Sequence, residues 1–301
     1  MDWFFYSHRL PIAYEAQKKG YEVHIATSTT DISIKNSLLA NGFNYHEIKF
    51  DRSGKSFLKL LNSFFSIVKL LLNIKPEILH LVTIQPIIFG GISAKILGLK
   101  KVVYAVSGLG HIFISNTFSS LIRRRLVLIL YKISFSVKNR FVIFQNPSDE
   151  LLIKKFCSLS SSESVIVPGS GVDLKEFYYT KPPKGIPTVL MASRLLISKG
   201  VREFAEAGKI LKERGVNVRF KLVGQTDSLN PLSIDLNEVK NWDKKGYIEY
   251  LGYQKNIHNL IQNSHLVVLP SYYPEGLPKV LCEAAASGRA VVTTNKPGCR
   301  D

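Results

Sequence analysis

The stretch from Ser264 to Asp301 constrains the fold more than any other part of the chain. Residues 266–269 form an apolar run of strand length, which prolines then interrupt. Apolar residues from Leu277 onward fall at helical spacing, and Gly288 predicts the end of that helix before a second strand at 290–293. A strand, a helix and a strand in this order predict a parallel βαβ unit.

The turn of this unit carries Pro-Glu-Gly and places a carboxylate directly ahead of the helix. The backbone N–H groups of Gly276 and Leu277 are expected at the carboxyl end of the strand, where parallel sheets bind anionic ligands. Glu283 follows Glu275 with seven residues between them, about two helical turns further on. We therefore expect both carboxylates to face one ligand.

With its flanks, VVLPSYYPEGLPKVLCEAAASGRAVV, the glutamate pair resembles the E-x7-E element of retaining glycosyltransferases of family 4. The resemblance implies an α/β chain with the GT-B architecture, in which two Rossmann-like, doubly wound parallel-sheet domains face a cleft. It also implies a nucleotide-sugar donor, expected to be a UDP-sugar. Glu283 would bind the ribose, and Glu275 would contact the sugar and stabilise an oxocarbenium-like centre. A bare pair of glutamates at this spacing is usually solvated surface, so the flanks carry the assignment.

Length and composition favour two domains and a positively charged surface. A chain of 301 residues with 46% hydrophobic residues can bury two cores. The net charge of +17 suits nucleic acid, an anionic membrane or a phosphate-bearing substrate. A nucleic-acid-binding protein and an inactive scaffold of the same fold stay open as alternatives. We find no platform of strands with interleaved aromatic and basic residues, which disfavours nucleic acid. Three cysteines without paired spacing indicate a reduced, cytoplasmic protein.

A Pro- and Gly-rich segment, KPPKGIP, separates the two predicted domains. We place an acceptor-side domain at 1–180, the linker at 181–187 and a nucleotide-sugar-binding domain at 188–301. Alternating strands and helices on both sides of the linker predict parallel sheets.

The N-terminal segment DWFFYSHRLPIAYEAQKKGYEVHIAT predicts a helix at 7–20 after a loop at 2–8. It resembles the first loop and helix of family 4 enzymes that extend undecaprenyl-diphosphate sugars in bacterial surface-glycan assembly. The resemblance implies a lipid-diphosphate-linked sugar acceptor, with His8 and Arg9 beside it, and an enzyme peripheral on the cytoplasmic face of the inner membrane. An ordinary polar surface is the other interpretation of these two residues.

Family members usually have a strand before such a loop and further strand–helix units after a segment like 295–301. We therefore expect this chain alone to lack its first strand and its C-terminal part, and to be poorly soluble and weakly active.

The segment SGLGHIFIS follows a predicted strand at 101–106. Gly108 and Gly110 allow a tight loop at the carboxyl end of that strand. In family 4 enzymes a polar residue here contacts the donor sugar, which implies a catalytic role for His111; hydrogen-bonded scaffolding is the alternative.

Five further residues are candidates for donor binding. Arg194 and Lys199 lie between a strand and a helix, and they resemble the family's donor-phosphate pair. Gly224 lets the next strand's loop pass close to the nucleotide, and by resemblance Gln254 and Ile257 lie where backbone groups hold the base.

No Asp-x-Asp motif and no His or Cys cluster with metal-ligand spacing occurs in the sequence. We therefore expect no cofactor and no metal. Arg194, Lys199 and the N–H groups after Gly276 would stabilise the departing diphosphate.

Two apolar helices carry basic residues. Residues 57–72 have apolar side chains at helical spacing, interleaved with Lys59 and Lys69, and a second predicted helix contains Arg123, Arg124 and Arg125. An apolar stripe that packs on a core looks the same in sequence as one that faces a membrane. For residues 57–72 we therefore favour the ordinary interpretation, a helix that covers the sheet. The arginines could attract anionic headgroups. No uninterrupted apolar run reaches the roughly 20 residues of a membrane span.

Overall fold

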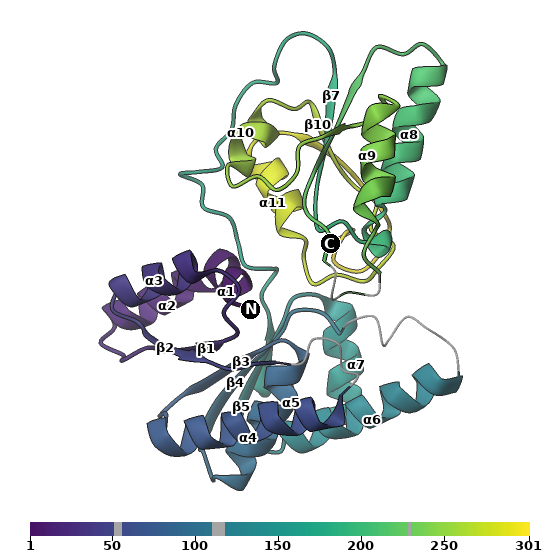
Figure 1. Cartoon of the computed structure of the whole chain (residues 1–301). Coiled ribbons are helices and arrows are strands. Elements are labelled where there is room, and N and C mark those ends of the chain that lie inside the picture. Colours follow the sequence, from purple (N-terminus) through teal and green to yellow (C-terminus); the bar gives the residue numbers. More distant parts are fainter. Residues whose placement is uncertain (51–55, 110–117, 228–229, 231) are drawn as a thin grey trace. The chain divides into compact units, whose positions relative to one another are not determined.

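The computed structural model describes residues 1–50, 56–109, 118–227, 230 and 232–301. The chain forms two compact units, which are drawn in Figure 1. The first unit comprises residues 1–106, 122–144 and 151–165. The second comprises residues 107–121, 145–150 and 166–301.

After the two N-terminal helices, strands and α-helices alternate up to residue 166, as the sequence pattern predicts. A four-stranded sheet has the order β3-β4-β5-β6, and β1 pairs with β2 in a separate parallel pair. The elements are α1 Asp2–His8, α2 Leu10–Lys18, β1 His24–Thr27, α3 Ile32–Ala40, β2 Asn44–Glu47, α4 Phe57–Ile74, β3 Leu79–Val82, α5 Ile84–Ile96, β4 Lys101–Val106, α6 Phe118–Ser134, β5 Asn139–Phe144, α7 Pro147–Cys157 and β6 Ser164–Ile166.

The second unit contains a five-stranded parallel sheet of order β11-β10-β7-β8-β9. Its elements are β7 Thr188–Ala192, the 3-10 turn η3 Ile197–Lys199, α8 Val201–Glu213, β8 Arg219–Val223, α9 Leu236–Lys244, β9 Glu249–Tyr250, α10 Ile257–Gln262, β10 Leu266–Leu269, α11 Lys279–Ala286 and β11 Ala290–Thr293.

Both faces of this second sheet are buried, as its central strand β7 shows. Val189 and Met191 pack in one core cluster with residues of α8 and α9. Leu190, on the opposite face, packs in another with residues of α10 and α11. Because helices cover both faces, the strand is apolar throughout rather than alternating. This is the doubly wound α/β arrangement that the sequence predicts.

Predicted boundaries are wrong at the N-terminus and at the start of α11. The helix predicted at 7–20 is α2, which runs from Leu10 to Lys18 after Arg9. Residues 2–8 form helix α1 rather than a loop, because the buried Asp2 carboxylate sits in its first turn and accepts bonds from the N–H groups of Thr30 (2.6 Å) and Asp31 (2.8 Å). Helix α11 begins at Lys279 rather than near Leu277. Helical backbone angles are disfavoured for a residue that precedes a proline, here Leu277, and Pro278 is the N-cap of α11.

Candidate active site

The turn between β10 and α11 holds Glu275 from both sides through its backbone. Its N–H donates to the carbonyl of Pro297 (3.0 Å). Its carbonyl accepts from the side-chain amide of Asn146 (3.1 Å). Gly298 is in the left-handed region (φ 81°), and a Cβ there would overlap the carbonyl oxygens of Glu275 and Gly276. The turn is therefore fixed before any ligand arrives.

The carboxylate of Glu275 lies against Lys199, the residue that the sequence assigns to the donor phosphates. The two side chains form an ion pair, and they are only 14% and 15% exposed. Ser271 Oγ also donates to Glu275 Oε1 (2.9 Å). Removed from bulk water, such charges interact more strongly than a surface pair does.

Lys199 reaches this position because two loops of the second sheet are tied together. It ends η3, and Gly200 follows it in the left-handed region (φ 78°) against the backbone of Pro270. The carbonyl of Ser198 accepts from the N–H of Tyr272 (3.2 Å), and Ser271 Oγ lies 3.2 Å from the same carbonyl oxygen. The β7–α8 and β10–α11 loops therefore bring their functional side chains together at the carboxyl ends of adjacent strands, as parallel sheets do.

Arg194 is more open than Lys199. Its side chain is 44% exposed, and its Nη1 lies 3.5 Å from Asp227 Oδ2. Gly224 has φ 147°, and a Cβ on it would overlap the carbonyl of Ser193. The glycine is thus required by close packing between the ends of β7 and β8, which gives it a structural reason independent of a nucleotide.

Glu283 is buried on α11, at 6% exposure. Burial raises the pKa of its carboxyl group, with a smaller contribution from Glu176, while the nearby Lys279 opposes the shift. Lys279 Nζ lies 3.5 Å from Glu283 Oε1, one helical turn away. Thus the two carboxylates of the E-x7-E element have different environments: Glu275 is paired directly with Lys199, and Glu283 is a buried side chain within a helix.

The remaining donor-side candidates lie on the same unit. Gly276 is buried, and a Cβ on it would overlap the side chain of Gln145, while Leu277 lies against Gly169. Gln254 Nε2 donates to the carbonyl of Leu251 (2.7 Å), and Ile257 begins α10 and packs at the edge of the core.

The acceptor-side candidates lie on the first unit. His8 ends α1 and stacks on Phe4, with ring centroids 4.5 Å apart. Arg9 is only 8% exposed, and its burial lowers the pKa of its guanidinium. Arg9 is therefore buried, and the interpretation of it as part of an ordinary polar surface is wrong. His111 lies outside the described residues.

Three polar residues of this site were missing from the sequence prediction: Ser271, Asn146 and Asp227. Each touches a predicted residue, namely Glu275 or Arg194. The signal was present for two of them, because Asn146 and Ser271 each follow a strand closely, at the end where ligands bind.

Burial around the turn also raises the pKa values of two side chains, Tyr273 and Asp149. Tyr273 has a pKa raised to about 12 by burial and by the negative charge of Glu275. Asp149 has a pKa raised to about 6 by burial, although Asn146 donates to its carboxylate (3.0 Å).

The raised pKa of Asp149 predicts a pH-dependent stability. Folding favours the protonated form, so its stabilising effect is present below about pH 4 and is lost as the pH rises through about 6. Compared with Asp149→Asn, the wild type should lose up to about 3 kcal/mol of unfolding free energy across this range. Urea denaturation from pH 4 to 7 measures this. The exposed-site variant Glu206→Gln is the control, and a pH-independent difference between wild type and Asp149→Asn would contradict the prediction.

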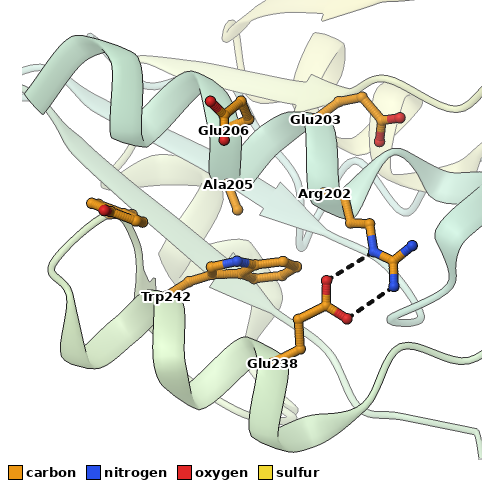
Figure 2. Close-up of a pocket in the computed structure, with 7 residues that line it drawn as sticks. Arg202, Glu203, Ala205, Glu206, Glu238 and Trp242 are labelled. Carbon is orange, nitrogen blue, oxygen red and sulfur yellow. Dashed lines mark hydrogen bonds and ion pairs between the residues drawn. The ribbon is translucent and has the colours of Figure 1, made fainter. Parts of the chain in front are cut away.

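A cavity of about 400 Å³ lies on α8 and α9, away from these residues. Figure 2 shows the ion pair between Arg202 and Glu238 in this cavity. Arg202 Nε and Nη2 donate to the two carboxylate oxygens of Glu238 at 2.8 and 2.9 Å. None of the predicted site residues lines this cavity. The ion pair joins the two helices, and the site is defined by the loops instead.

Within the part of the chain that the structure describes, no group of three or more His, Cys, Asp or Glu side chains is arranged to hold a metal ion. The expectation of a metal-independent reaction stays a prediction.

Two family models match the chain. Residues 1–146 match the model described as glycosyl transferase 4-like, and residues 175–301 match glycosyl transferases group 1.

Curated relatives extend this match over nearly the whole chain. The N,N'-diacetylbacillosaminyl-diphospho-undecaprenol alpha-1,3-N-acetylgalactosaminyltransferase of Campylobacter jejuni is 30% identical over 307 residues, which cover 98% of this chain and 78% of the relative. The UDP-Gal:alpha-D-GlcNAc-diphosphoundecaprenol alpha-1,3-galactosyltransferase of Escherichia coli is 28% identical over 260 residues, which cover 81% of this chain and 64% of that enzyme.

Solved structures share the fold at low sequence identity. HepE of Anabaena, in complex with UDP and glucose, superposes with a TM-score of 0.71 at 17% identity, covering 96% of this chain and 77% of HepE. WaaG, a glycosyltransferase involved in lipopolysaccharide biosynthesis, gives the same TM-score and coverages at 14% identity. These matches confirm the predicted fold class. The chain belongs to the family 4-like glycosyltransferases and has their GT-B fold.

Proposed function

We propose that this protein transfers a sugar from a UDP-sugar to an undecaprenyl-diphosphate-linked glycan, with retention of anomeric configuration, during assembly of a bacterial surface glycan. The reaction needs no metal ion. The protein acts at the cytoplasmic face of the inner membrane without spanning it, attracted to the anionic bilayer surface that carries its acceptor. Nucleic acid is not its partner.

One observation supports the proposal above the others: Lys199 and Glu275, each about 85% buried, meet at the carboxyl ends of adjacent parallel strands. A cation fixed there can stabilise the negative charge that develops on a departing diphosphate. The carboxylate beside it can stabilise the positive charge that develops on the sugar. Both groups are already oriented by the tied loops, so little reorganisation accompanies the reaction.

The acceptor assignment draws on the relatives. Two relatives that match most of this chain are named for undecaprenol-diphosphate sugars, and one of them is named for a UDP-sugar donor. The net charge of +17 favours both an anionic bilayer and a diphosphate-bearing acceptor.

The direct test is a screen of UDP-sugars with a short polyprenyl-diphosphate sugar as acceptor, scored by UDP release with and without EDTA. We expect one UDP-sugar to support release that depends on the acceptor and persists in EDTA. Release that requires Mg²⁺ would refute metal independence alone. No release with any UDP-sugar would refute the donor assignment.

The two glutamates should separate binding from turnover. Glu283→Ala should lose nucleotide affinity if Glu283 holds the ribose, whereas Glu275→Gln should bind UDP normally and turn over poorly. Calorimetry with UDP, followed by rate measurements on both variants, tests this. The isosteric Glu283→Gln is the matched control for loss of side-chain volume in the buried site. Equal loss of UDP affinity in Glu283→Ala and Glu275→Gln would contradict the division of roles.

A further inference from the structure

Helix α4 has two apolar faces: one packs on the core, and the other is exposed among the residues that the structure describes. Ser63, Ile67 and Leu71 are buried, and the last two join a core cluster with Ile48. At about 100° per residue, a second apolar arc about 100° wide lies beside this face. Its five members are exposed: Phe57 (73%), Leu58 (78%), Leu61 (37%), Phe65 (62%) and Leu72 (51%). We call these five residues the α4 ridge.

The flank of the α4 ridge that faces away from the core is polar. Lys69 borders the ridge directly, and Lys59 lies further around the same flank; both are exposed. The helix contains no acidic residue. Lysines beside an apolar arc can extend along it while keeping their ammonium groups in a polar headgroup layer.

Helix α6 repeats this arrangement. Its core face is marked by the buried Leu128, Tyr131 and Ser134. On the opposite side, four exposed residues repeat at helical spacing within an arc of about 60°. They are Ile122 (56%), Leu126 (55%), Ile129 (43%) and Ile133 (40%), and we call them the α6 ridge.

Basic side chains border the α6 ridge on both sides. Arg125 and Lys132 lie along one flank, and Arg123 lies along the other. All three are exposed. Scattered exposed apolar residues are normal on a protein surface, but ordered ridges bordered by basic groups mark an interaction site.

We propose that the α4 and α6 ridges are the surface by which the first unit docks on an anionic phospholipid bilayer. The apolar side chains enter the boundary between headgroups and acyl chains, and the lysines and arginines contact the headgroups. This surface deepens the proposed function, because it holds the enzyme on the membrane that carries its lipid-linked acceptor. The exposure of the ridges and the charge beside them are the same whichever sugar is transferred.

The docked helix α4 lies along the bilayer surface rather than across it. By length and composition alone this helix could span a membrane, and only 17% of it is buried. However, one face is packed on the core through Ile67 and Leu71, and Ser63 Oγ donates to the carbonyl of Lys49 (2.8 Å). A spanning orientation would break these contacts, whereas an orientation in the interface keeps them.

The experiment measures binding of the full chain to vesicles without donor or acceptor. Vesicles of phosphatidylcholine, with or without phosphatidylglycerol, are sedimented at several salt concentrations. One variant changes Phe57, Leu61 and Phe65 to Ser, and another changes Ile122, Leu126 and Ile129 to Ser. The control variant changes three highly exposed apolar residues outside the ridges to Ser, namely Ile32 (71%), Leu151 (72%) and Leu174 (69%).

We expect each ridge variant to bind anionic vesicles at least about 10-fold more weakly than wild type, with the control variant within about twofold. Arg125→Gln and Lys132→Gln should each weaken binding about fivefold at low salt and less at high salt. Wild-type binding that is equal on neutral and anionic vesicles would overturn the proposal. An equal loss in the control and ridge variants would do the same.

A fluorescence measurement places the ridge in the bilayer directly. In Phe65→Trp, brominated acyl chains should quench the emission added relative to wild type, while Ile32→Trp should not be quenched. Absence of quenching in Phe65→Trp would overturn the proposal. A wild-type dimer in sedimentation analysis, with the ridge variants monomeric, would also overturn it, because a second copy of the chain would then cover the ridges. Alkaline carbonate should release the full chain from the vesicles, because a helix that lies in the plane of the interface does not span the bilayer. Protein that stays on the vesicles in carbonate would overturn the in-plane orientation. Since no substrate is present, these results are independent of the UDP-release screen.

Discussion

Lys199→Ala should reduce turnover by at least about 100-fold. The ammonium group is 15% exposed and paired with Glu275, so it acts on the diphosphate from a partly dehydrated position. A charge-assisted contact that strengthens as the leaving group departs is worth about 3 kcal/mol, which corresponds to this factor in rate. The variant also leaves the Glu275 carboxylate without its cation, which adds to the loss.

Steady-state rates of UDP release measure this effect, and the chain supplies a control. Lys209→Ala removes a lysine from α8 that pairs with Glu206 at the surface (2.9 Å), and it should leave turnover unchanged. Arg194→Ala should also reduce turnover by about 100-fold if Arg194 binds the diphosphate. Activity indifferent to both Lys199→Ala and Arg194→Ala would refute the phosphate assignment.

Gly200→Ala should destabilise the second unit by about 2–5 kcal/mol and abolish activity. The residue has φ 78°, where a side chain costs about 1–2 kcal/mol. Its Cβ would also overlap the backbone of Pro270, and the resulting shift adds about 1–3 kcal/mol. Because Lys199 precedes Gly200 directly, the same shift would move the ammonium group away from Glu275.

Gly215→Ala separates the backbone cost from the clash. Gly215 has a similar φ of 69° at the end of α8, but no atom lies within 4 Å of the added Cβ. It should cost only about 1 kcal/mol and keep activity. Chemical denaturation of both variants decides the point: an equal loss of unfolding free energy would show that the close approach of the two loops is not required.

Several strands were predictable because apolar residues dominate them, although Arg219 and Lys221 interrupt the apolar run of β8. The predicted bounds of β4, β7, β8, β10 and β11 agree with the structure. Where helices cover both faces of a sheet, its strands are buried on both sides and are therefore apolar, which makes them recognisable in the sequence. Strands β2 and β9 are shorter or more polar, and β2 was not predicted.

The interactions between loops could not be predicted in the same way. Lys199 and Glu275 were each assigned a role, but their ion pair joins positions 76 residues apart in the chain. The start of α1 depends on Asp2, whose partners are Thr30 and Asp31. These contacts depend on how the chain returns to the same place, and local spacing does not contain that information.

Helix α4 shows a different limit. Its apolar residues occupy nearly two thirds of the helix circumference, so the sequence pattern contains both a core face and an exposed ridge. The core face agrees with the predicted helix that covers the sheet, since Ile67 and Leu71 pack on the core. The exposure of Phe57 and Phe65 in the structure separates the two faces.

The anomeric configuration of the product distinguishes transfer from a UDP-sugar with retention from transfer with inversion. The protein would be incubated with the UDP-sugar selected by the screen and a polyprenyl-diphosphate sugar, and the new linkage assigned by NMR alongside quantified UDP. We expect one UDP released for each linkage formed and the same anomeric configuration in product and donor. A product of inverted configuration, or a linkage formed without release of UDP, would contradict it.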